Sequence, residues 1–177
     1  MWDKAKATET IVYLANRIDD PTKMKIFKLL YFADKLHMSR YGRFITGDVY
    51  VAMEHGPVPS RIYTITQEVE RGQESDAFAM PDNKRITPLR QADLYELSQT
   101  EIECLDETLG RLGHLTASQL RARSHSSAWS KMTGDGAMFN NDSPSKSVPI
   151  PLELIVEELP NAAEVRELLQ REGYIAT

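Results

Sequence analysis

The chain has very little cysteine, since Cys104 is the only one among its 177 residues. A single cysteine excludes an internal disulfide and is typical of proteins from reducing compartments. Cys104 lies on a predicted amphipathic helix and has no histidine near it in the sequence. We therefore interpret it as a packing residue rather than as a catalytic nucleophile.

Long apolar runs are also missing. No apolar stretch approaches the ~20 residues that a membrane-spanning helix needs. The N-terminal stretch, MWDKAKATET, lacks the apolar centre of a signal peptide. We therefore expect a cytoplasmic protein without a membrane partner.

Positive charge is scarce relative to negative charge. The chain has 21 Lys and Arg residues against 26 Asp and Glu residues, which gives a formal net charge of -5. Proteins that bind nucleic acids usually present a basic surface, so this balance argues against a nucleic-acid partner. An acidic protein suits a basic protein partner better.

The common catalytic motifs are absent as well. The sequence has no H-E-x-x-H, no CxxC, no G-x-S-x-G and no glycine-rich phosphate loop. The serines on either side of His125 are more typical of turns and helix caps than of a nucleophile. We expect no cofactor and no metal, and we interpret the protein as non-enzymatic.

The composition that is present suits one globular domain. Hydrophobic residues make up 41% of the chain and charged residues 27%, which is the usual balance of a folded protein. The apolar residues recur mostly at helical spacing, with short extended stretches between them. We expect an α+β, mostly helical fold: a single domain of about six to seven helices with a small antiparallel β-hairpin element.

The stretch from Met24 to Tyr41 predicts the helix around which the other elements are organised. It is apolar around most of its circumference, so we expect it to be packed on several sides. Asp20 is expected to cap its start with Pro21 in the first turn, and Gly42 is expected to end it. Its clearly polar arc holds Lys25, Lys28, Lys35 and Ser39.

Asp34 and His37 lie inside the apolar part of this helix, three residues apart, so their side chains can meet. With Glu54 and His55 they would suit an acid–base or metal site. The interpretation we favour is that His37 is a core histidine bonded to Asp34 or to a backbone carbonyl. Such a pair would fix the helix against the E-H-G-P-V-P loop, residues 54–59.

Turn residues and caps place the other elements. A first hairpin is expected over residues 44–53 with its turn at 46–48, followed by extended residues 55–59. A second is expected between residues 78 and 87, residues 94–97 are a strand or a helical turn, and residues 133–147 are expected to be a loop. The expected helices are 3–18, 60–71 with Ser60 as N-cap, one after a Thr100/Glu103 capping box, one after a Thr116/Gln119 capping box, Pro151–Leu159, and Ala162–Glu172 capped by Asn161.

Residues that commonly dominate protein interfaces gather near the central helix in the sequence. Tyrosine, tryptophan and arginine are enriched at binding hot spots. The alternative is that the aromatic residues fill the core. The aromatic residues in question are Tyr31, Tyr41, Tyr50, Tyr63 and Trp129, and the arginines are Arg40, Arg43 and Arg61.

Residues 28–63, KLLYFADKLHMSRYGRFITGDVYVAMEHGPVPSRIY, resemble the signature of the Panacea domain, a GepA-like, phage-associated family. The later S-H-S-S-A-W, residues 124–129, resembles the second block of that family. The resemblance spans most of residues 8–131. It implies a single Panacea-like domain over residues 1–177, with residues 148–177 as a C-terminal helical extension.

The resemblance implies an antitoxin that neutralises a cognate toxin, encoded by the adjacent gene, by direct binding. One alternative is an adaptor that delivers the toxin to a AAA+ protease. Another is a small hydrolase or nucleotide-binding enzyme that uses Asp34, His37 and His55. The candidate partner-binding residues are Tyr31, Asp34, His37, Arg40, Tyr41, His55, Arg61 and Trp129.

Overall fold

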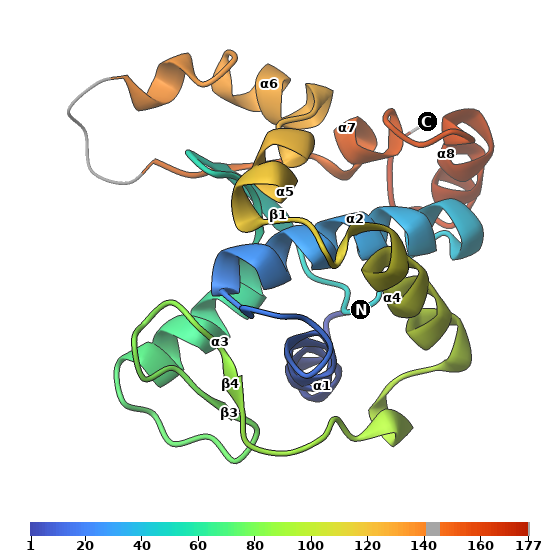
Figure 1. The fold of residues 1–177 in the computed structure, drawn as a ribbon. Helices are drawn as coiled ribbons and strands as arrows, with labels where there is room; N and C mark the ends of the chain where they lie inside the picture. Colours follow the sequence, from blue (N-terminus) through green and yellow to red (C-terminus); the bar gives the residue numbers. More distant parts are fainter. Residues whose placement is uncertain (141–145, 177) are drawn as a thin grey trace.

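The computed structural model describes residues 1–140 and 146–176, and it confirms a mostly helical α+β fold (Figure 1). The described residues form eight α-helices, two short 3-10 helices and five short strands. The α-helices are α1 (Lys4–Ala15), α2 (Lys23–Tyr41), α3 (Ser60–Glu70), α4 (Gln99–Leu112), α5 (Ala117–Ser124), α6 (Ser127–Thr133), α7 (Leu152–Val156) and α8 (Ala162–Arg171).

Two small antiparallel sheets accompany the helices. The first has the strand order β2-β1-β5, and the second is a hairpin of β3 and β4. The strands are β1 (Tyr50–Met53), β2 (Gly56–Pro59), β3 (Phe78–Ala79), β4 (Thr87–Pro88) and β5 (Val148–Pro149). The 3-10 helices are η1 (Leu94–Glu96) and η2 (Ala137–Phe139).

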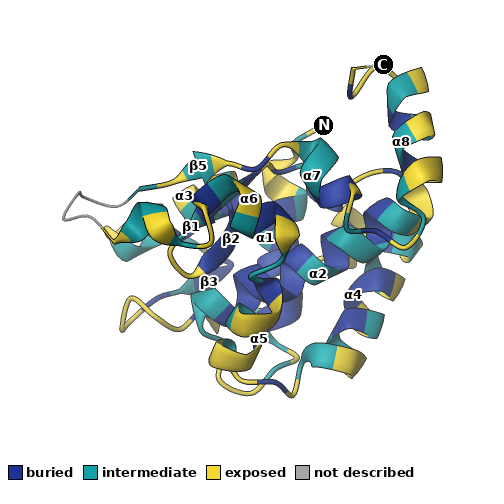
Figure 2. Ribbon diagram, turned by 90° about the horizontal axis from the view of Figure 1, so that it is seen from above, coloured by how far each residue is buried: buried dark blue, intermediate teal, exposed yellow. Residues whose placement is uncertain are grey.

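Helix α2 is the central element, as its apolar circumference predicts. It contacts α1, α4, α5, α7, α8 and β2, and it crosses the middle of the molecule between two groups of helices (Figure 1). Seen from above, α2 is mostly buried, whereas α8 at the edge is mostly intermediate or exposed (Figure 2). The predicted end of α2 at Gly42 is confirmed, because Gly42 is the C-cap of this helix and takes a left-handed φ of 68°.

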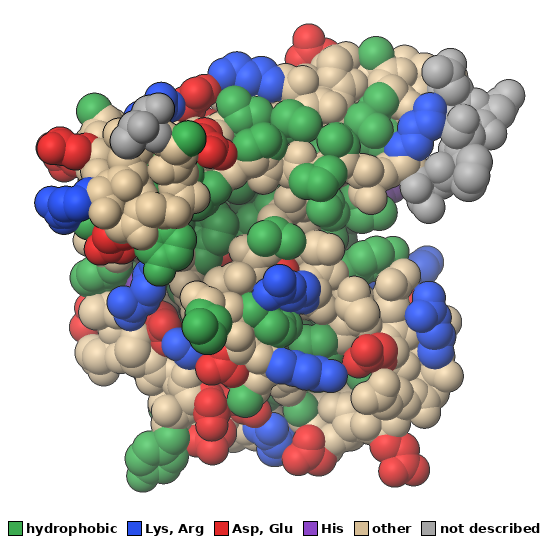
Figure 3. All heavy atoms as spheres, turned by 180° about the vertical axis from the view of Figure 1, so that it is seen from behind, with side chains coloured by type: hydrophobic (Ala, Val, Ile, Leu, Met, Phe, Trp, Pro, Cys, Tyr) green, Lys and Arg blue, Asp and Glu red, His purple; other side chains and the backbone are tan. Residues whose placement is uncertain are grey.

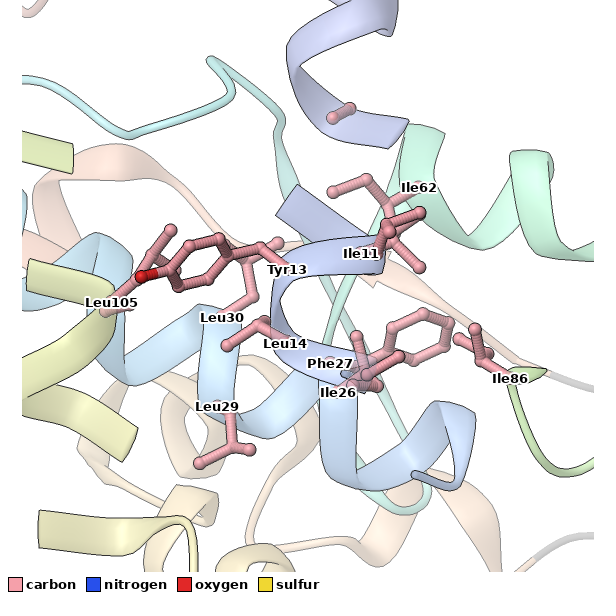
Figure 4. Close-up of a cluster of buried hydrophobic side chains, with 14 of the residues drawn as sticks. Ile11, Tyr13, Leu14, Ile26, Phe27, Leu29, Leu30, Ile62, Ile86 and Leu105 are labelled. Atoms are coloured by element: carbon pink, nitrogen blue, oxygen red, sulfur yellow. The ribbon is translucent and has the colours of Figure 1, made fainter. Parts of the chain in front are cut away.

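The main core lies between α2 and the helices α1, α3 and α4. Side chains from all four point into one cluster (Figure 4). Burying one such aliphatic side chain contributes roughly 1.5–3 kcal/mol relative to leaving it in water. The members that meet here include Ile11, Leu14, Leu30, Ile62 and Leu105, all of which have no exposed surface.

The predicted cap at the start of α2 is wrong. Thr22, not Asp20, is the N-cap, and its hydroxyl accepts from the N–H of Lys25 at 3.2 Å. The cause is a tertiary contact, because residues 21–23 run beside residues 84–86, with Ile86 N–H donating to the Pro21 carbonyl at 2.8 Å. Asp20 instead pairs with Arg85 at 2.7 Å.

The first predicted hairpin is displaced along the chain. Strand β1 pairs with β2 rather than with residues 44–45. The two prolines of β2 favour extended backbone, and they are tolerated because β2 is at the edge of its sheet. Residues 43–49 remain a loop, held by the side chains of Asp34 and Asp48.

Two further caps differ from the prediction. Ser60 lies inside α3, and the buried Asp48 caps that helix by accepting from the N–H groups of Arg61 and Ile62. The capping box of α4 is Ser98 with Glu101. The Thr116/Gln119 box at α5 is confirmed.

The second hairpin is confirmed as β3 with β4, and residues 94–96 are helical rather than extended. The expected loop over residues 133–147 lies partly outside the described residues, since 141–145 are not among them. Its described part includes η2. Among the helices described, none has the length and hydropathy needed to cross a membrane.

Residues 146–176 form what we call the C-terminal arm. It contains β5, which pairs with β1, and then α7 and α8, which both contact α2. The two helices agree with the prediction, whereas β5 was not expected. Asn161 is the N-cap residue of α8 as predicted, but its side chain makes no capping hydrogen bond. It accepts instead from the Ser39 hydroxyl at 2.6 Å and donates to the Ser39 carbonyl at 2.9 Å.

Candidate partner-binding site

Asp34 is a buried acid that joins α2 to residues 45–50. Its side chain has no exposed surface. One carboxylate oxygen accepts from the N–H of Ile45 at 2.6 Å, and the other accepts from the hydroxyl of Tyr50 at 2.7 Å. Burial raises the pKa of Asp34 to about 7, and the two hydrogen bonds oppose that rise.

His37 is also fully buried, and it joins α2 to a different pair of neighbours. Its Nδ1 lies 2.8 Å from the carbonyl oxygen of Arg43 and its Nε2 lies 3.3 Å from the hydroxyl of Thr100. A carbonyl can only accept, so Nδ1 carries the proton and Nε2 accepts from Thr100. Burial lowers the pKa of His37, which favours this neutral form.

These contacts decide between the two interpretations of His37. It bonds to a backbone carbonyl and not to Asp34, whose two oxygens are bonded to Ile45 and Tyr50. The hypothesis that the two residues pair and fix α2 against the E-H-G-P-V-P loop is therefore wrong. The physical reason is that residues 43–50 pass over this part of α2 and supply closer partners.

Lys28 is the residue of α2 that holds the E-H-G-P-V-P loop, and sequence reasoning missed it. It was assigned to the polar arc, yet it has no exposed surface and its Nζ donates to the Pro57 carbonyl at 2.6 Å. Burial lowers the pKa of Lys28 to about 7. Gly56 leaves room for this contact, because a Cβ there would lie 2.9 Å from Lys28 Nζ and 2.6 Å from Ser124 Oγ.

The S-H-S-S-A-W segment also serves the fold. The rings of His125 and Trp129 stack at 3.9 Å with an angle of 1° between their planes. The indole N–H of Trp129 donates to the Met53 carbonyl at 2.8 Å, which ties α6 to β1. The hydroxyl of Ser124 donates to the Arg121 carbonyl at 2.8 Å, as expected for a serine at a helix end.

The eight candidate partner-binding residues fall into two groups. Tyr31, Asp34, His37 and Trp129 are buried. Arg40, Tyr41, His55 and Arg61 are exposed; the first two end α2, His55 lies between β1 and β2, and Arg61 lies in the first turn of α3. Arg40 pairs with Glu107 of α4 at 2.7 Å, and Arg61 lies over the ring of Trp2 at 5.4 Å.

One surface hollow is lined by residues that lie within the signature segment or close to it in space. We call it the motif groove; it has a volume of about 350 Å³. Its walls come from the start of α2, the β1–β2 hairpin, the first turn of α3, and Phe139 of η2. They include Phe27, Met53, His55, Val58 and Tyr63, with Lys23, Glu54 and Lys146 also lining it.

The motif groove is lined mainly by apolar and aromatic side chains, with a few charged groups among them. Phe27 and Tyr63 meet edge to face at 6.0 Å and form its aromatic wall. Lys23 lies on one side and pairs with Glu70. Within the described residues, no group of three His, Cys, Asp or Glu side chains is placed to hold a metal ion.

A comparison with known families decides which family this is. The family model for SocA-like antitoxins, the Panacea domain, matches residues 26–130, which is more than half of the chain. The chain belongs to the SocA-like Panacea family. The comparisons with curated proteins and with solved structures gave no match.

The family match covers residues 26–130, which we call the Panacea segment, and does not include the C-terminal arm. The matched range runs from within α2 to within α6, so it contains the buried polar contacts of α2 and most of the walls of the motif groove. The arm follows the matched range and packs on α2 from outside it. The general role of an antitoxin follows from the family.

Proposed function

We propose that this Panacea protein is a non-enzymatic antitoxin that neutralises a cognate toxin by direct binding at the motif groove. The observation that carries the proposal is where the signature residues lie. Most of them are buried and hold segments together, whereas those around the β1–β2 turn and in the first turn of α3 line one apolar surface hollow, next to Phe27, which directly precedes the signature segment. We infer that the hollow is where the signature acts on a partner.

The groove suits a large apolar side chain of the toxin. Apolar pockets with a few polar groups at the edge are typical binding sites, and buried aromatic or methionine contacts often dominate interfaces. Phe27, Met53 and Tyr63 would contact that side chain, and His55 with Glu54 would contact polar groups around it.

The other candidate residues take supporting roles in this proposal. Arg40, Tyr41 and Arg61 are exposed and would lie at the margin of a larger interface. Tyr31, Asp34, His37 and Trp129 are buried and would set the shape of the surface without touching the toxin. A toxin encoded by the adjacent gene, acting in the cytoplasm, is the partner we propose.

Co-expression with the adjacent gene tests the proposal. The chain should restore growth and co-purify with the toxin, and Tyr63→Ala should weaken binding at least ten-fold. Tyr95→Ala is the matched control, because Tyr95 is fully exposed on η1 and is not among the residues that line the groove. Failure of rescue together with no co-purification, or unchanged affinity in Tyr63→Ala, would contradict it.

The same system separates masking from the alternatives. Toxin that persists in an inactive complex supports masking, whereas toxin loss that requires a AAA+ protease supports delivery by an adaptor. An enzyme using Asp34, His37 and His55 would lose function in His55→Ala even where toxin binding is retained. The structure offers that reading little support, because Asp34 and His37 are bonded to neighbouring parts of the fold.

A further inference from the structure

The C-terminal arm inserts one carboxylate, that of Glu158, into a site made by the Panacea segment. The side chain of Glu158 is only 8% exposed. The donors around it are an ammonium group, two hydroxyls and one backbone N–H, which we call the carboxylate socket. They are Lys35 Nζ at 2.7 Å, Tyr31 OH at 3.3 Å, Ser127 Oγ at 3.1 Å and Ala128 N–H at 2.6 Å.

The socket stabilises the charged form of its occupant. Burial by itself raises the pKa of Glu158, yet the hydrogen bonds from Lys35 and Ala128 outweigh it and hold the pKa below its usual value. Hydrogen bonds to an ionised group are among the stronger ones in proteins. The socket is therefore selective for a carboxylate over a neutral side chain.

All four socket residues lie in the matched range, whereas Glu158 lies outside it. The arm also makes recognition contacts on both sides of Glu158. Upstream, β5 adds a strand to β1. Downstream, Asn161 bonds to Ser39. Apolar residues of α7, which precedes Glu158, and of α8, which follows it, pack around Met38.

The arm does not fill the surface of the Panacea segment against which it packs. A hollow of about 460 Å³ remains between the arm and the rest of the molecule. Figure 3 shows apolar side chains lining a hollow beside the part of the molecule that the arm forms. One wall includes Met38, Phe44 and Ile45, and the other includes Leu152 and Leu169. The hollow is open to solvent, so the apolar side chains that line it are left without a close partner.

We propose that this face of the Panacea segment is a docking surface for a partner segment that carries a carboxylate followed by large apolar side chains, and that the arm is its displaceable occupant. The partner would place its acid in the socket and fill the hollow. We assign it to the cognate toxin, a step that rests on the proposed function. The arm itself shows the chemistry that the surface binds.

Hydrogen exchange on the wild-type full-length protein is the first test. If the arm is displaceable, its amides should exchange through local opening, at least ten-fold faster than those of the buried turns of α2 and α4. Replacing Glu158 by Gln should increase that exchange further. Arm amides that exchange only together with the α2 and α4 amides, through global unfolding, would overturn the proposal.

A labelled peptide of residues 146–176 is the second test. In the wild-type protein the attached arm has a high effective concentration and should exclude the peptide. Full-length Glu158→Ala, whose arm is loosened, should bind the peptide at least ten-fold more tightly than the wild type does. Glu153→Ala is the control, because Glu153 lies in the same arm and forms no ion pair among the described residues. This variant should behave like the wild type.

A peptide that itself carries Glu158→Ala should bind the loosened protein at least ten-fold more weakly. Equal binding of both peptides, or no binding of either, would overturn the carboxylate socket. Neither test contains the toxin, so both can fail while growth rescue succeeds. With the toxin present, Glu158→Ala should bind it at least five-fold more tightly, and an unchanged affinity would overturn the toxin as the occupant.

Discussion

The two sides of α2 differ in how completely they are filled. Toward α1 and α4, Leu30 packs against residues such as Leu14 and Leu105, and none of the three has exposed surface. Toward the arm, Met38 borders a hollow of about 460 Å³ and polar side chains make many of the contacts. One helix thus has a closely packed side and a side that leaves apolar surface open, and the open side is the one that we propose as a docking surface.

The largest expected effect tests that contrast directly. Leu30→Ala should lower the free energy of unfolding by ~2–5 kcal/mol, because it opens a cavity in a close-packed core. Leu169→Ala, on the arm side and next to the hollow, should cost less than half as much, because its surroundings are already incompletely packed. Urea denaturation of both variants measures the difference, and equal losses would break the comparison.

Asp34, which bonds to Ile45 and Tyr50 beside the hollow, makes the stability of the fold depend on pH. Its pKa is raised from 3.8 to about 7 by burial, so its contribution is greatest below pH 3.8 and is lost as the pH rises through about 7. Asp34→Asn, which keeps the shape and cannot ionise, should remove this slope. Urea denaturation at pH 4, 5.5 and 7 tests it, and identical slopes in both proteins would contradict the assignment.

Lys28 should produce a slope of opposite sign in a higher pH range. Its pKa is lowered from 10.5 to about 7. Between these values the unfolded chain binds more protons than the native protein, so the stability contribution rises with pH from about 7 to 10.5. Lys28→Met should abolish the rise, whereas the exposed Lys84→Met should retain it. Denaturation at pH 7 and pH 9 is the measurement.

The smallest effect on stability is expected at exposed charges. Arg40→Glu breaks an ion pair with Glu107 on the surface, and such pairs contribute ~0–1 kcal/mol. Under the proposed function, Arg40→Glu and Arg61→Glu should weaken toxin binding while leaving the melting temperature nearly unchanged. If both variants bind the toxin with unchanged affinity, the surface around Arg40 and Arg61 lies outside the interface.

Much of the helical framework could be predicted from the sequence, because apolar spacing reflects which residues of a helix face inward. The pattern of Met24–Tyr41 predicted a helix packed on several sides, and α2 contacts five other helices. Gly42 ended it as expected, and Thr116 with Gln119 formed the predicted capping box. These features could be predicted because the residues that interact in them lie only a few positions apart in the sequence.

The candidate site was less accessible from the sequence. Trp129 and His37 were singled out as candidate partner-binding residues, but both are buried and contact neighbouring parts of the fold. Lys28 carried no signal of its own, since a lysine on a helix is normally solvated. Its burial depends on the Pro57 carbonyl, which lies 29 residues further along the chain. The role of Glu158 in the arm was equally hidden.

By itself, the sequence determined the family, the helices and the non-basic surface charge, because these depend on residue types and on spacing within one segment. Only the tertiary structure decided which partner each buried polar group finds. Asp48 caps a helix that begins twelve residues later, Asp34 bonds to Tyr50 rather than to His37, and Glu158 enters a site on α2 and α6. The physical reason is that a buried hydrogen bond requires proximity in space, which the fold brings about between residues far apart in the chain.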